Sequence, residues 1–488
     1  MLVTALSIFL GGLGLFFAIF FAKTHRLKRM ASSIPGPKGL PFFGNGLEIG
    51  TSSADFIPYF HKMYNQYKSC YRIWILHNLI VFVNSVEDYK NMLSDRKVMK
   101  KAYVYDYMTP FLGDGLVTSS GEKWKHDRKK LAPFFYFSTL KLYIDTQSKN
   151  IDTMIKKLSS YVDTPEFNIL PVTMYCALES ILTTSVSTMV DCSKIKALLE
   201  FTKFAQQTTS YRMLRPWFGI DSLFWISRVR RSEKRCIENM HRILKGFIDN
   251  REKTSQTERN SHPSLLDMLL DLKDKNIFTE KDVVDGLITI ISAGSDTTAT
   301  STSLTCWLLA KHPDIQEKVM EELDEIFGNS NRPTTYEDIV QMKYLERVIK
   351  ESLRLYPIVP MFGRKLKEDY KTGNYTIPAG ANVFVFVWGI HRDPEIFPDP
   401  EKFDPDRFLP KNLVNRNDLC YMPFSCGPRN CIGQKYALLF MKSAISGILR
   451  KYKLLPGTIP LNFHADVTLY PSTGVNLRLS KRSSIEEI

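Results

Sequence analysis

The amino-acid sequence predicts a mainly α-helical protein with a small β-sheet region and one N-terminal transmembrane helix. Residues 2–22 form an uninterrupted uncharged stretch of 21 residues, long enough to cross a bilayer as a helix. Two apolar runs rich in β-formers, 71–75 and 79–83, are separated by a short turn and indicate a hairpin. Most of the chain after this hairpin has the apolar period of a helix. With 488 residues and 44% hydrophobic content, it can bury a large core.

A basic cluster directly after the apolar stretch sets its orientation. Lys23, Arg26, Lys28 and Arg29 should stay on the cytoplasmic side under the positive-inside rule, which places the N-terminus in the lumen. A cleaved secretory signal is the competing interpretation, but the stretch has no basic residue before it and no small residues where cleavage would occur. We therefore expect residues 1–23 to be a transmembrane anchor.

The rest of the chain divides into a short linker and one large domain. Residues 24–45 are basic and then proline-rich, and the prolines of segment 34–41 disfavour helix and sheet, which predicts a stiff linker. Residues 46–488 contain no boundary that would split them. Their most polar interior run, 251–264, is short and lies between helical patterns, as is typical of a surface loop.

Composition narrows the compartment and the partners. The net charge of +14 comes from 65 basic and 51 acidic residues. No zinc-finger, basic-zipper or RNA-recognition signature accompanies it, so we expect no nucleic-acid partner and favour anionic lipid or an acidic protein. The eight cysteines have no framework spacing, which is typical of reduced thiols facing the cytosol.

Two segments in the first half carry unusual side chains. Residues 121–130 read as a basic helix on which Trp124 and Arg128 share one face. The lysines of this helix are either solvated or part of a docking surface for an acidic partner. The aromatic segment 216–226 joins two helical segments, and it indicates either core packing or contact with a membrane interface.

A long, nearly apolar helix is expected from Thr279 to about residue 310. Thr279 and Asp282 have the spacing of a capping box. Its middle, segment 293–298, reads Ala-Gly-Ser-Asp-Thr-Thr, and such residues weaken the hydrogen-bond ladder and compete for its carbonyls. This breach of helix preference predicts a function there, with a local bulge beside Thr297.

An acid and a base follow on the next helical pattern. Glu351 and Arg354 are three residues apart on one face and can pair. An isolated pair of this kind is weak evidence for a special role, since exposed pairs are common. Farther on, Arg407 lies in the Pro-Asp-Arg-Phe segment 405–408, and Arg364 follows the extended apolar segment 357–361.

The chain is organised around residues 424–433, Phe-Ser-Cys-Gly-Pro-Arg-Asn-Cys-Ile-Gly. Its glycines and proline prevent regular structure up to Cys431, after which 434–449 reads as an amphipathic helix. Free amides and the dipole at a helix N-terminus favour the thiolate that a metal requires. Two alternatives remain open: a zinc cluster of Cys420, Cys426 and Cys431, which lacks a CxxC pair, or Cys426 as the ligand.

This loop resembles the haem-binding loop of the cytochrome P450 family. Phe424, Gly427, Arg429, Cys431 and Gly433 stand at its five defining positions. The resemblance implies a cytochrome P450 fold and haem b as cofactor, with Cys431 as the axial ligand of its iron. It also implies that Phe424, Arg429 and Gly433 lie against the haem.

Other segments match further motifs of the same family. Trp124 and Arg128 form its W-x-x-x-R pair, which implies hydrogen bonds to a haem propionate, and Arg364 is a further propionate candidate. In segment 293–298, which matches A-G-x-D-T-T, the resemblance implies that Thr297 assists dioxygen activation and that Asp296 relays protons. Three further residues, by the same resemblance, form a structural network that holds the haem loop: Glu351, Arg354 and Arg407.

Segments 121–124 and 424–436 resemble the fatty-acid ω-hydroxylase branch, which is family 4-like and of an insect type. Many of its members carry a glutamate at the position of Ala293, and that glutamate can esterify the haem. Ala293 allows no ester, so we expect the thiolate and non-covalent contacts alone to hold the haem.

The sequence contains no G-x-G-x-x-G after a strand and no Walker loop, so the chain is expected to bind no nicotinamide. The resemblance implies electrons from NADPH–cytochrome P450 reductase, with cytochrome b5 as an optional donor. It implies a monooxygenase that inserts one atom of O2 into a lipophilic substrate, which is a fatty acid, hormone or xenobiotic. The expected location is the endoplasmic reticulum membrane, with the catalytic domain 46–488 in the cytosol. A reductase-independent isomerase or dehydratase, or a haem-binding protein without turnover, are the alternatives.

Overall fold

The computed structural model of the chain describes residues 4, 11, 14, 21–22, 24–95, 97–187, 190–254, 264–414 and 418–482. The expected transmembrane anchor, 1–23, lies almost wholly outside these residues, as does most of the expected surface loop 251–264. Within the described part of the chain, no helix combines the length and apolar character needed to cross a bilayer.

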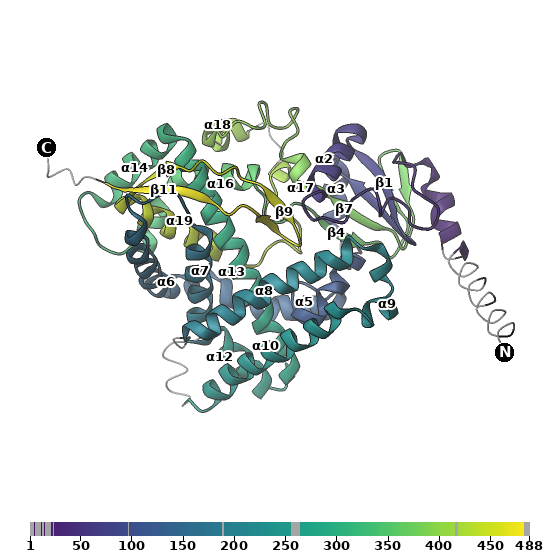
Figure 1. Cartoon of the computed structure of the whole chain (residues 1–488), viewed down its shortest axis with the longest axis horizontal. Helices are drawn as coiled ribbons and strands as arrows, with labels where there is room; N and C mark the ends of the chain where they lie inside the picture. The colour runs from purple at the N-terminus through teal and green to yellow at the C-terminus, as the bar shows by residue number, and fades with distance from the viewer. Residues whose placement is uncertain are drawn as a thin grey trace.

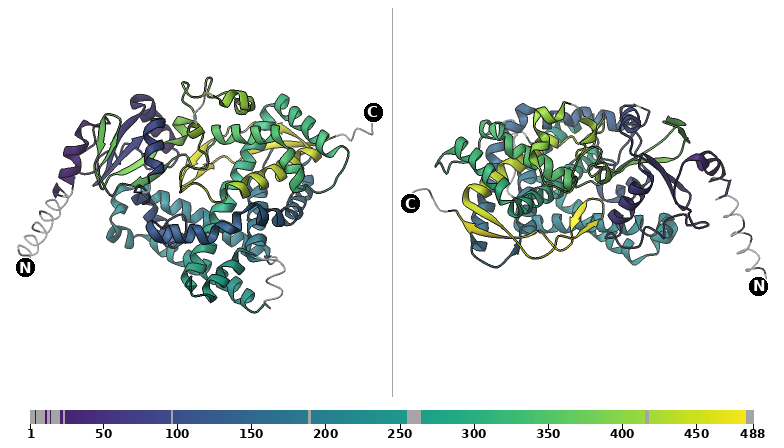
Figure 2. Two further views of the ribbon diagram at one scale, coloured as in Figure 1. Left: turned by 180° about the vertical axis from the view of Figure 1, so that it is seen from behind. Right: turned by 90° about the horizontal axis from the view of Figure 1, so that it is seen from above.

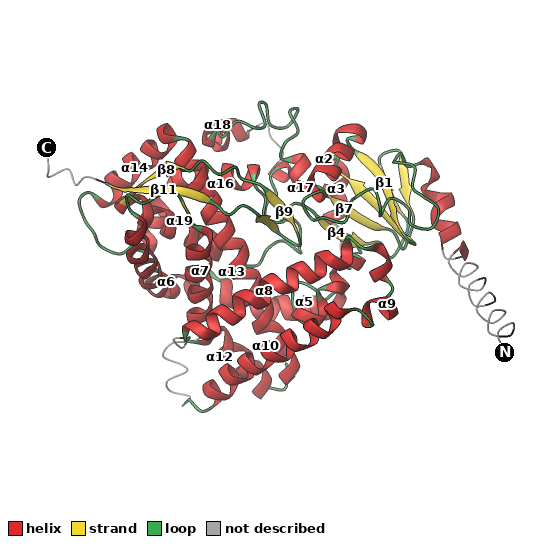
Figure 3. Cartoon of the chain, in the orientation of Figure 1, coloured by secondary structure: helices red, strands yellow, loops and turns green. Residues whose placement is uncertain are grey.

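Helices dominate the body, and small sheets lie towards its two ends (Figures 1 and 3). The helices are α2 (Phe56–Tyr67), α3 (Val86–Ser94), α4 (Thr109–Leu112), α5 (Gly121–Leu131), α6 (Phe137–Leu158), α7 (Leu170–Val186), α8 (Cys192–Met213), α9 (Asp221–Trp225), α10 (Arg228–Glu252), α12 (Leu265–Asp274), α13 (Glu280–Lys311), α14 (Pro313–Phe327), α15 (Tyr336–Gln341), α16 (Lys343–Leu355), α17 (Val387–Ile390), α18 (Pro410–Leu413) and α19 (Gln434–Lys451). The strands are β1 (Cys70–Ile75), β2 (Asn78–Val83), β3 (Phe167–Asn168), β4 (Phe362–Lys365), β5 (Tyr370–Thr372), β6 (Tyr375–Ile377), β7 (Asn382–Val385), β8 (Tyr452–Pro456), β9 (Phe463–Ala465), β10 (Leu469–Pro471) and β11 (Asn476–Lys481).

The largest sheet has the order β1-β2-β7-β4 and contains the expected hairpin. Strands β1 and β2 pair antiparallel, and Leu76 in their turn has a φ of 51°, so the hairpin prediction is confirmed. Strand β7 pairs parallel with β2 and antiparallel with β4. The proline-rich segment runs along this sheet, since Pro35 accepts a bond from the Arg72 amide at 2.8 Å and Ile34 is fully buried. This segment is therefore packed against the body.

Helix α13 crosses the middle of the molecule and joins two of its hydrophobic cores (Figure 1). Its first half packs with α8, α10 and α12, and its second half with α7, α16 and α19. The expected capping box is present, because Thr279 and Asp282 each accept the other's backbone amide. The expected bulge beside Thr297 is wrong, since α13 is a continuous α-helix from Glu280 to Lys311.

The aromatic segment 216–226 is a short 3-10 turn followed by α9, which together join α8 to α10. Phe224 is buried, whereas Trp225 and Ile226 are 71% and 81% exposed. Core packing therefore explains only part of this segment.

The two ends of the described chain lie at opposite ends of the molecule (Figure 2).

Glu351 and Arg354 on α16 form an ion pair with no solvent exposure. The guanidinium of Arg354 donates to both oxygens of Glu351, at 2.7 and 2.8 Å, and to the carbonyl of His391 at 2.8 Å. Glu351 also accepts from Arg407 at 3.3 Å and from the Asp404 amide at 3.0 Å. The structure thus brings together the three residues that the sequence analysis grouped.

Replacing Glu351 with alanine should strongly destabilise the fold, because it leaves the Arg354 guanidinium buried without a counter-charge. We expect Glu351→Ala to lower the free energy of unfolding by about 3 to 5 kcal/mol, measured by chemical denaturation. The matched control is Asp271→Ala, which breaks an exposed pair with Lys275 and should cost less than about 1 kcal/mol. Equal effects of the two changes would contradict a special role for the buried pair.

Candidate active site

The loop before α19 has a conformation that only its own residue types allow. Gly427 has a φ of 71°, and a β-carbon there would lie 2.5 Å from the Leu93 carbonyl, so no other residue fits. The Cys431 amide donates to the Phe424 carbonyl at 2.9 Å, which closes the loop on itself. Gly433 then precedes the first turn of α19. The loop therefore holds Cys431 at a helix N-terminus, as the sequence predicts.

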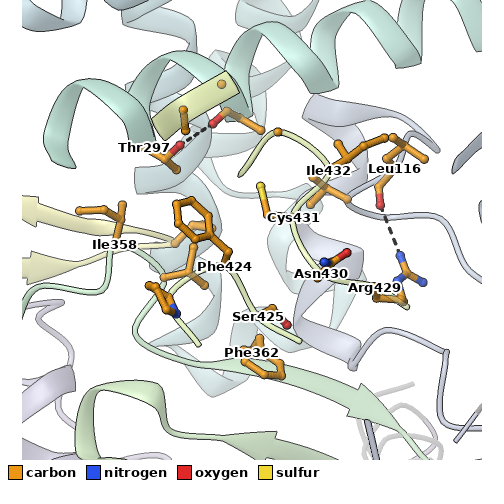
Figure 4. Close-up of a pocket in the computed structure, with 18 of the residues that line it drawn as sticks. Leu116, Thr297, Ile358, Phe362, Phe424, Ser425, Arg429, Asn430, Cys431 and Ile432 are labelled. Atoms are coloured by element: carbon orange, nitrogen blue, oxygen red, sulfur yellow. Dashed lines mark hydrogen bonds between the residues drawn. The ribbon is translucent and has the colours of Figure 1, made fainter. Parts of the chain in front are cut away.

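The Cys431 thiol faces a large internal cavity of about 350 Å³ (Figure 4). Cys431 has exposed surface although it lies deep in the chain, because that surface borders the cavity. Cys420 is buried and Cys426 is half-buried, and neither lines the cavity. In the described residues, no three histidine, cysteine, aspartate or glutamate side chains converge on a metal-sized space. The cavity geometry therefore singles out Cys431.

The Cys431 thiol is under opposing electrostatic influences. Burial raises its pKa, whereas the amides of Gly433 and Gln434 and the charge of Arg128 lower it, and burial dominates. The amides at the helix N-terminus therefore favour the thiolate, as expected, but without a bound metal the effect of burial is larger. A metal can supply the missing stabilisation, because metal binding displaces the thiol proton.

Four cations line the same cavity: Lys101, Arg128, Arg364 and Arg429. Arg429 donates to three backbone carbonyls and lies over the Trp124 ring, 4.5 Å from its centre. Arg128 donates to the carbonyl and side-chain oxygens of Asn430, at 2.8 and 2.9 Å. None of the four cations forms an ion pair with a carboxylate of the described chain.

This concentration of positive charge is electrostatically unfavourable without an anion. Burial and then Arg364 lower the pKa of Arg429 to about 9. Burial, followed by Arg364 and Arg429, lowers the pKa of Lys101 well below its usual value. Lys101 could not be predicted from the sequence, because it lies outside every motif. It reaches the cluster because its backbone bridges to Arg364. The cluster suits a ligand that brings carboxylates.

Helix α13 forms the wall of the cavity facing the loop (Figure 4). Ala293, Gly294 and Thr297 line it, and the Thr297 hydroxyl donates to the Ala293 carbonyl at 2.8 Å. Ala293 is exposed in the middle of a buried helix because the cavity lies against it. Phe424, Gly433 and the apolar residues Val359 and Met361 also line the cavity.

Asp296, in contrast, is buried beside the cavity and does not line it. One of its oxygens accepts from Gln206 on α8 at 2.8 Å and from the Thr468 hydroxyl at 3.0 Å. Burial raises the pKa of Asp296 even though both bonds lower it. Neither partner was found from the sequence, because no local pattern signals a contact from so far along the chain.

Comparison with known proteins decides which family uses this arrangement. Residues 34–476 match the family model described as "Cytochrome P450". The chain belongs to the cytochrome P450 family. The P450 chain is 32% identical to "Cytochrome P450 4V2" of Mus musculus, with 92% of this chain and 90% of the relative covered. It is 31% identical to "Cytochrome P450 4c3" of Drosophila melanogaster, over 97% and 94% of the two chains, and 35% identical to "Cytochrome P450 4c21" of Blattella germanica, over 89% and 90%.

Membership makes this P450 a haem-dependent monooxygenase with relatives in family 4, some of them from insects. The family cofactor is haem b, held by a cysteine thiolate. The residues present fit this group: one thiol faces a mainly apolar cavity, and four unpaired cations on its wall suit the haem carboxylates. No glutamate stands at position 293, so the ester link is absent here.

The raised pKa of Asp296 predicts a pH-dependent stability difference. A carboxyl whose folded pKa lies above its unfolded value of about 4 stabilises the fold below that pH, and this contribution is lost as pH rises through the folded value. Asp296→Asn cannot titrate and keeps an acceptor oxygen for Gln206 and Thr468. We expect this variant to gain stability relative to the unmodified chain as pH rises towards neutrality, measured by urea unfolding across that range. A difference that stays constant with pH would contradict the assignment.

Proposed function

We propose that this P450 hydroxylates a lipophilic substrate, with Cys431 as the axial ligand of its haem and electrons from NADPH–cytochrome P450 reductase. The observation that carries the proposal is the single cysteine thiol facing a mainly apolar cavity whose only described cations cluster beside the cysteine loop. When bound, the haem supplies the iron chemistry that activates dioxygen. The chain's own residues hold the haem, orient the substrate and manage protons.

The cations and the loop hold the cofactor in this proposal. Arg128, Arg364, Arg429 and Lys101 bind the haem carboxylates, and the Trp124 ring supports Arg429 from below. The three backbone bonds of Arg429 fix its guanidinium before any ligand binds. Phe424 and Gly433 flank the thiol. The hydrogen bonds of Glu351 with Arg354 and Arg407 hold this loop in place relative to α16.

Asp296 and Thr297 manage protons in this proposal. The Thr297 hydroxyl lies on the cavity wall and donates to the Ala293 carbonyl, and by exchanging that bond it can donate to an oxygen atom held in the cavity. Asp296 lies behind it, and its raised pKa lets the carboxyl hold a proton closer to neutral pH. A reductase-independent isomerase or dehydratase is less well supported, because the adjacent acid and hydroxyl would have no task there.

The redox partner is proposed to dock beside the loop, on the lysines of α5. Lys123 is paired with Asp127 and Asp282, and Lys125 with Glu122, which weakens the expectation that all four lysines take part. Lys129 and Lys130 form no ion pair with any described residue. They follow Arg128, which contacts Asn430 of the loop, so a partner bound there is near the haem side. Cytochrome b5 could use the same charges.

Reversing one of these unpaired charges should slow electron transfer. We expect Lys129→Glu to slow reduction by the reductase roughly tenfold at low ionic strength, with the difference shrinking as salt is added. Stopped-flow reduction of the carbon monoxide complex measures this rate. Lys318→Glu on α14 makes the same charge change at another exposed site and should leave the rate unchanged. Equal slowing by both variants would count against docking at α5.

We also propose that residues 1–23 anchor the enzyme in the endoplasmic reticulum membrane, with linker 24–45 and catalytic domain 46–488 on the cytosolic side. The uncharged stretch followed by basic residues supports this topology. Exposed Trp225 and Ile226 support a second membrane contact beside α9. Flotation of the chain with and without residues 1–23 on liposomes tests the anchor. Unchanged flotation of the shortened chain would assign membrane binding to the α9 region instead.

The proposed activity is tested with the holoenzyme, the reductase and a panel of lipophilic probes. We expect a thiolate-type carbon monoxide difference spectrum, followed by NADPH consumption matched by hydroxylated product. Cys431→Ser should lose that spectral signature, whereas Cys426→Ser should keep it. NADPH consumption without product, or no consumption, would favour a haem protein that lacks this turnover.

A further inference from the structure

The charges on the cavity wall are separated into two regions. All four cations gather beside the cysteine loop, where the proposed function pairs them with the haem carboxylates. Asp466 is the one carboxylate that lines the cavity within the described residues. Asp466 lies in the tight turn between β9 and β10. Its backbone amide donates to the Thr468 carbonyl at 3.2 Å.

Asp466 has no positive partner of its own. It forms no ion pair and no side-chain hydrogen bond with any described residue, and it is a partly exposed residue of the cavity lining. Its charge helps to raise the pKa values of Asp296 and Tyr470. Asp466 therefore brings an acid without a cation to the wall of the cavity, apart from the cations beside the cysteine loop.

The turn that carries Asp466 is held firmly in place. On one side the Ala465 amide donates to the Ser53 carbonyl at 2.9 Å, and on the other the Leu469 amide donates to the Ile358 carbonyl at 2.7 Å. The Thr468 hydroxyl donates to Asp296 on α13 at 3.0 Å. These bonds fix the turn against three separate segments, so Asp466 has its place in the cavity lining before a substrate arrives.

A fixed carboxylate in an apolar cavity discriminates between substrate head groups. A hydroxyl can donate a charge-assisted hydrogen bond to it. A second carboxylate would be repelled, and the low dielectric of the cavity strengthens that repulsion. An ester or ether offers only acceptor atoms, which cannot pair with an ionised acid.

We propose that Asp466 selects neutral lipophiles with a hydroxyl head group and disfavours free fatty acids, an inference that rests on the proposed function of the cavity. The hydroxyl of the substrate donates to Asp466, and its hydrocarbon chain extends over the apolar wall formed by residues such as Ile358, Val359 and Met361. The reaction then takes place on the chain at a distance from that hydroxyl.

Equilibrium dialysis of the holoenzyme with three probes of equal chain length tests the proposal without relying on turnover. The probes are dodecan-1-ol, methyl dodecanoate and dodecanoate. We expect dodecan-1-ol to bind about tenfold more tightly than methyl dodecanoate, and dodecanoate to bind most weakly. Equal binding of dodecanoate and dodecan-1-ol would overturn the proposal.

Two variants assign the preference to this side chain. Asp466→Asn keeps the shape and removes the charge, so it should strengthen dodecanoate binding about tenfold, and Asp466→Lys should reverse the order of acid and alcohol. Asp274→Asn, on the exposed end of α12, removes the same charge elsewhere and should keep the original order. An unchanged order in both Asp466 variants, or a matching change in Asp274→Asn, would refute the role of Asp466.

The carbon monoxide difference spectrum of each protein separates this inference from the proposed function. Loss of the thiolate signature in the unmodified chain would refute the proposed function itself. A normal spectrum together with no head-group discrimination would refute only the role of Asp466.

Discussion

The buried ion pair between Glu351 and Arg354 is the interaction on which the site geometry depends. From this pair a line of bonds leads to the cysteine loop: His391 contacts the Arg354 carbonyl through Nδ1 at 3.2 Å and accepts the Met422 amide at Nε2, at 3.0 Å. Because a carbonyl only accepts and an amide only donates, both bonds require a neutral imidazole with its proton on Nδ1. Met422 lies two residues before the loop that contains Cys431. A line of hydrogen bonds therefore connects the buried charge pair to the start of this loop.

The second constraint is the way the cavity distributes charge. The four cations at the loop form no ion pair with a described carboxylate, and Arg364 and Arg429 are buried. This concentration of charge is unfavourable by itself and becomes favourable once a dianionic cofactor binds. On the far side, Asp296 has two hydrogen-bond donors and Asp466 has none from a side chain. The two acids thus differ in availability: Asp296 is held by two side-chain donors, whereas Asp466 has no side-chain partner among the described residues. Both belong to a cavity that is otherwise largely apolar.

The sequence alone predicts those features that arise from neighbouring residues. The hairpin of β1 and β2, the capping box and length of α13, and the placement of Cys431 before α19 all follow from local periodicity and turn chemistry. Spacing also predicts the Glu351–Arg354 pair, whereas the inclusion of Arg407 was implied only by the resemblance to the family. Lys101, Gln206, Thr468, His391 and Asp466 could not be found this way, since each acts through contacts with distant parts of the chain. The predicted bulge in α13 is wrong, because the helix is intact and the Thr297 hydroxyl donates to one of its carbonyls. The ion pair of Lys123 with Asp282 could not be predicted either, since these residues are far apart in the sequence.

The segment 26–35, which leads into the first sheet, is packed against the enzyme body. Arg26 pairs with Asp369 beside β5, Ala31 and Ile34 have no solvent exposure, and Pro35 is bonded to β1. A flexible tether would let the body tumble through all tilts relative to whatever precedes residue 24. Here residues 26–35 are held at a fixed place on the body by these contacts. The α9 face consequently keeps one position relative to residues 26–35.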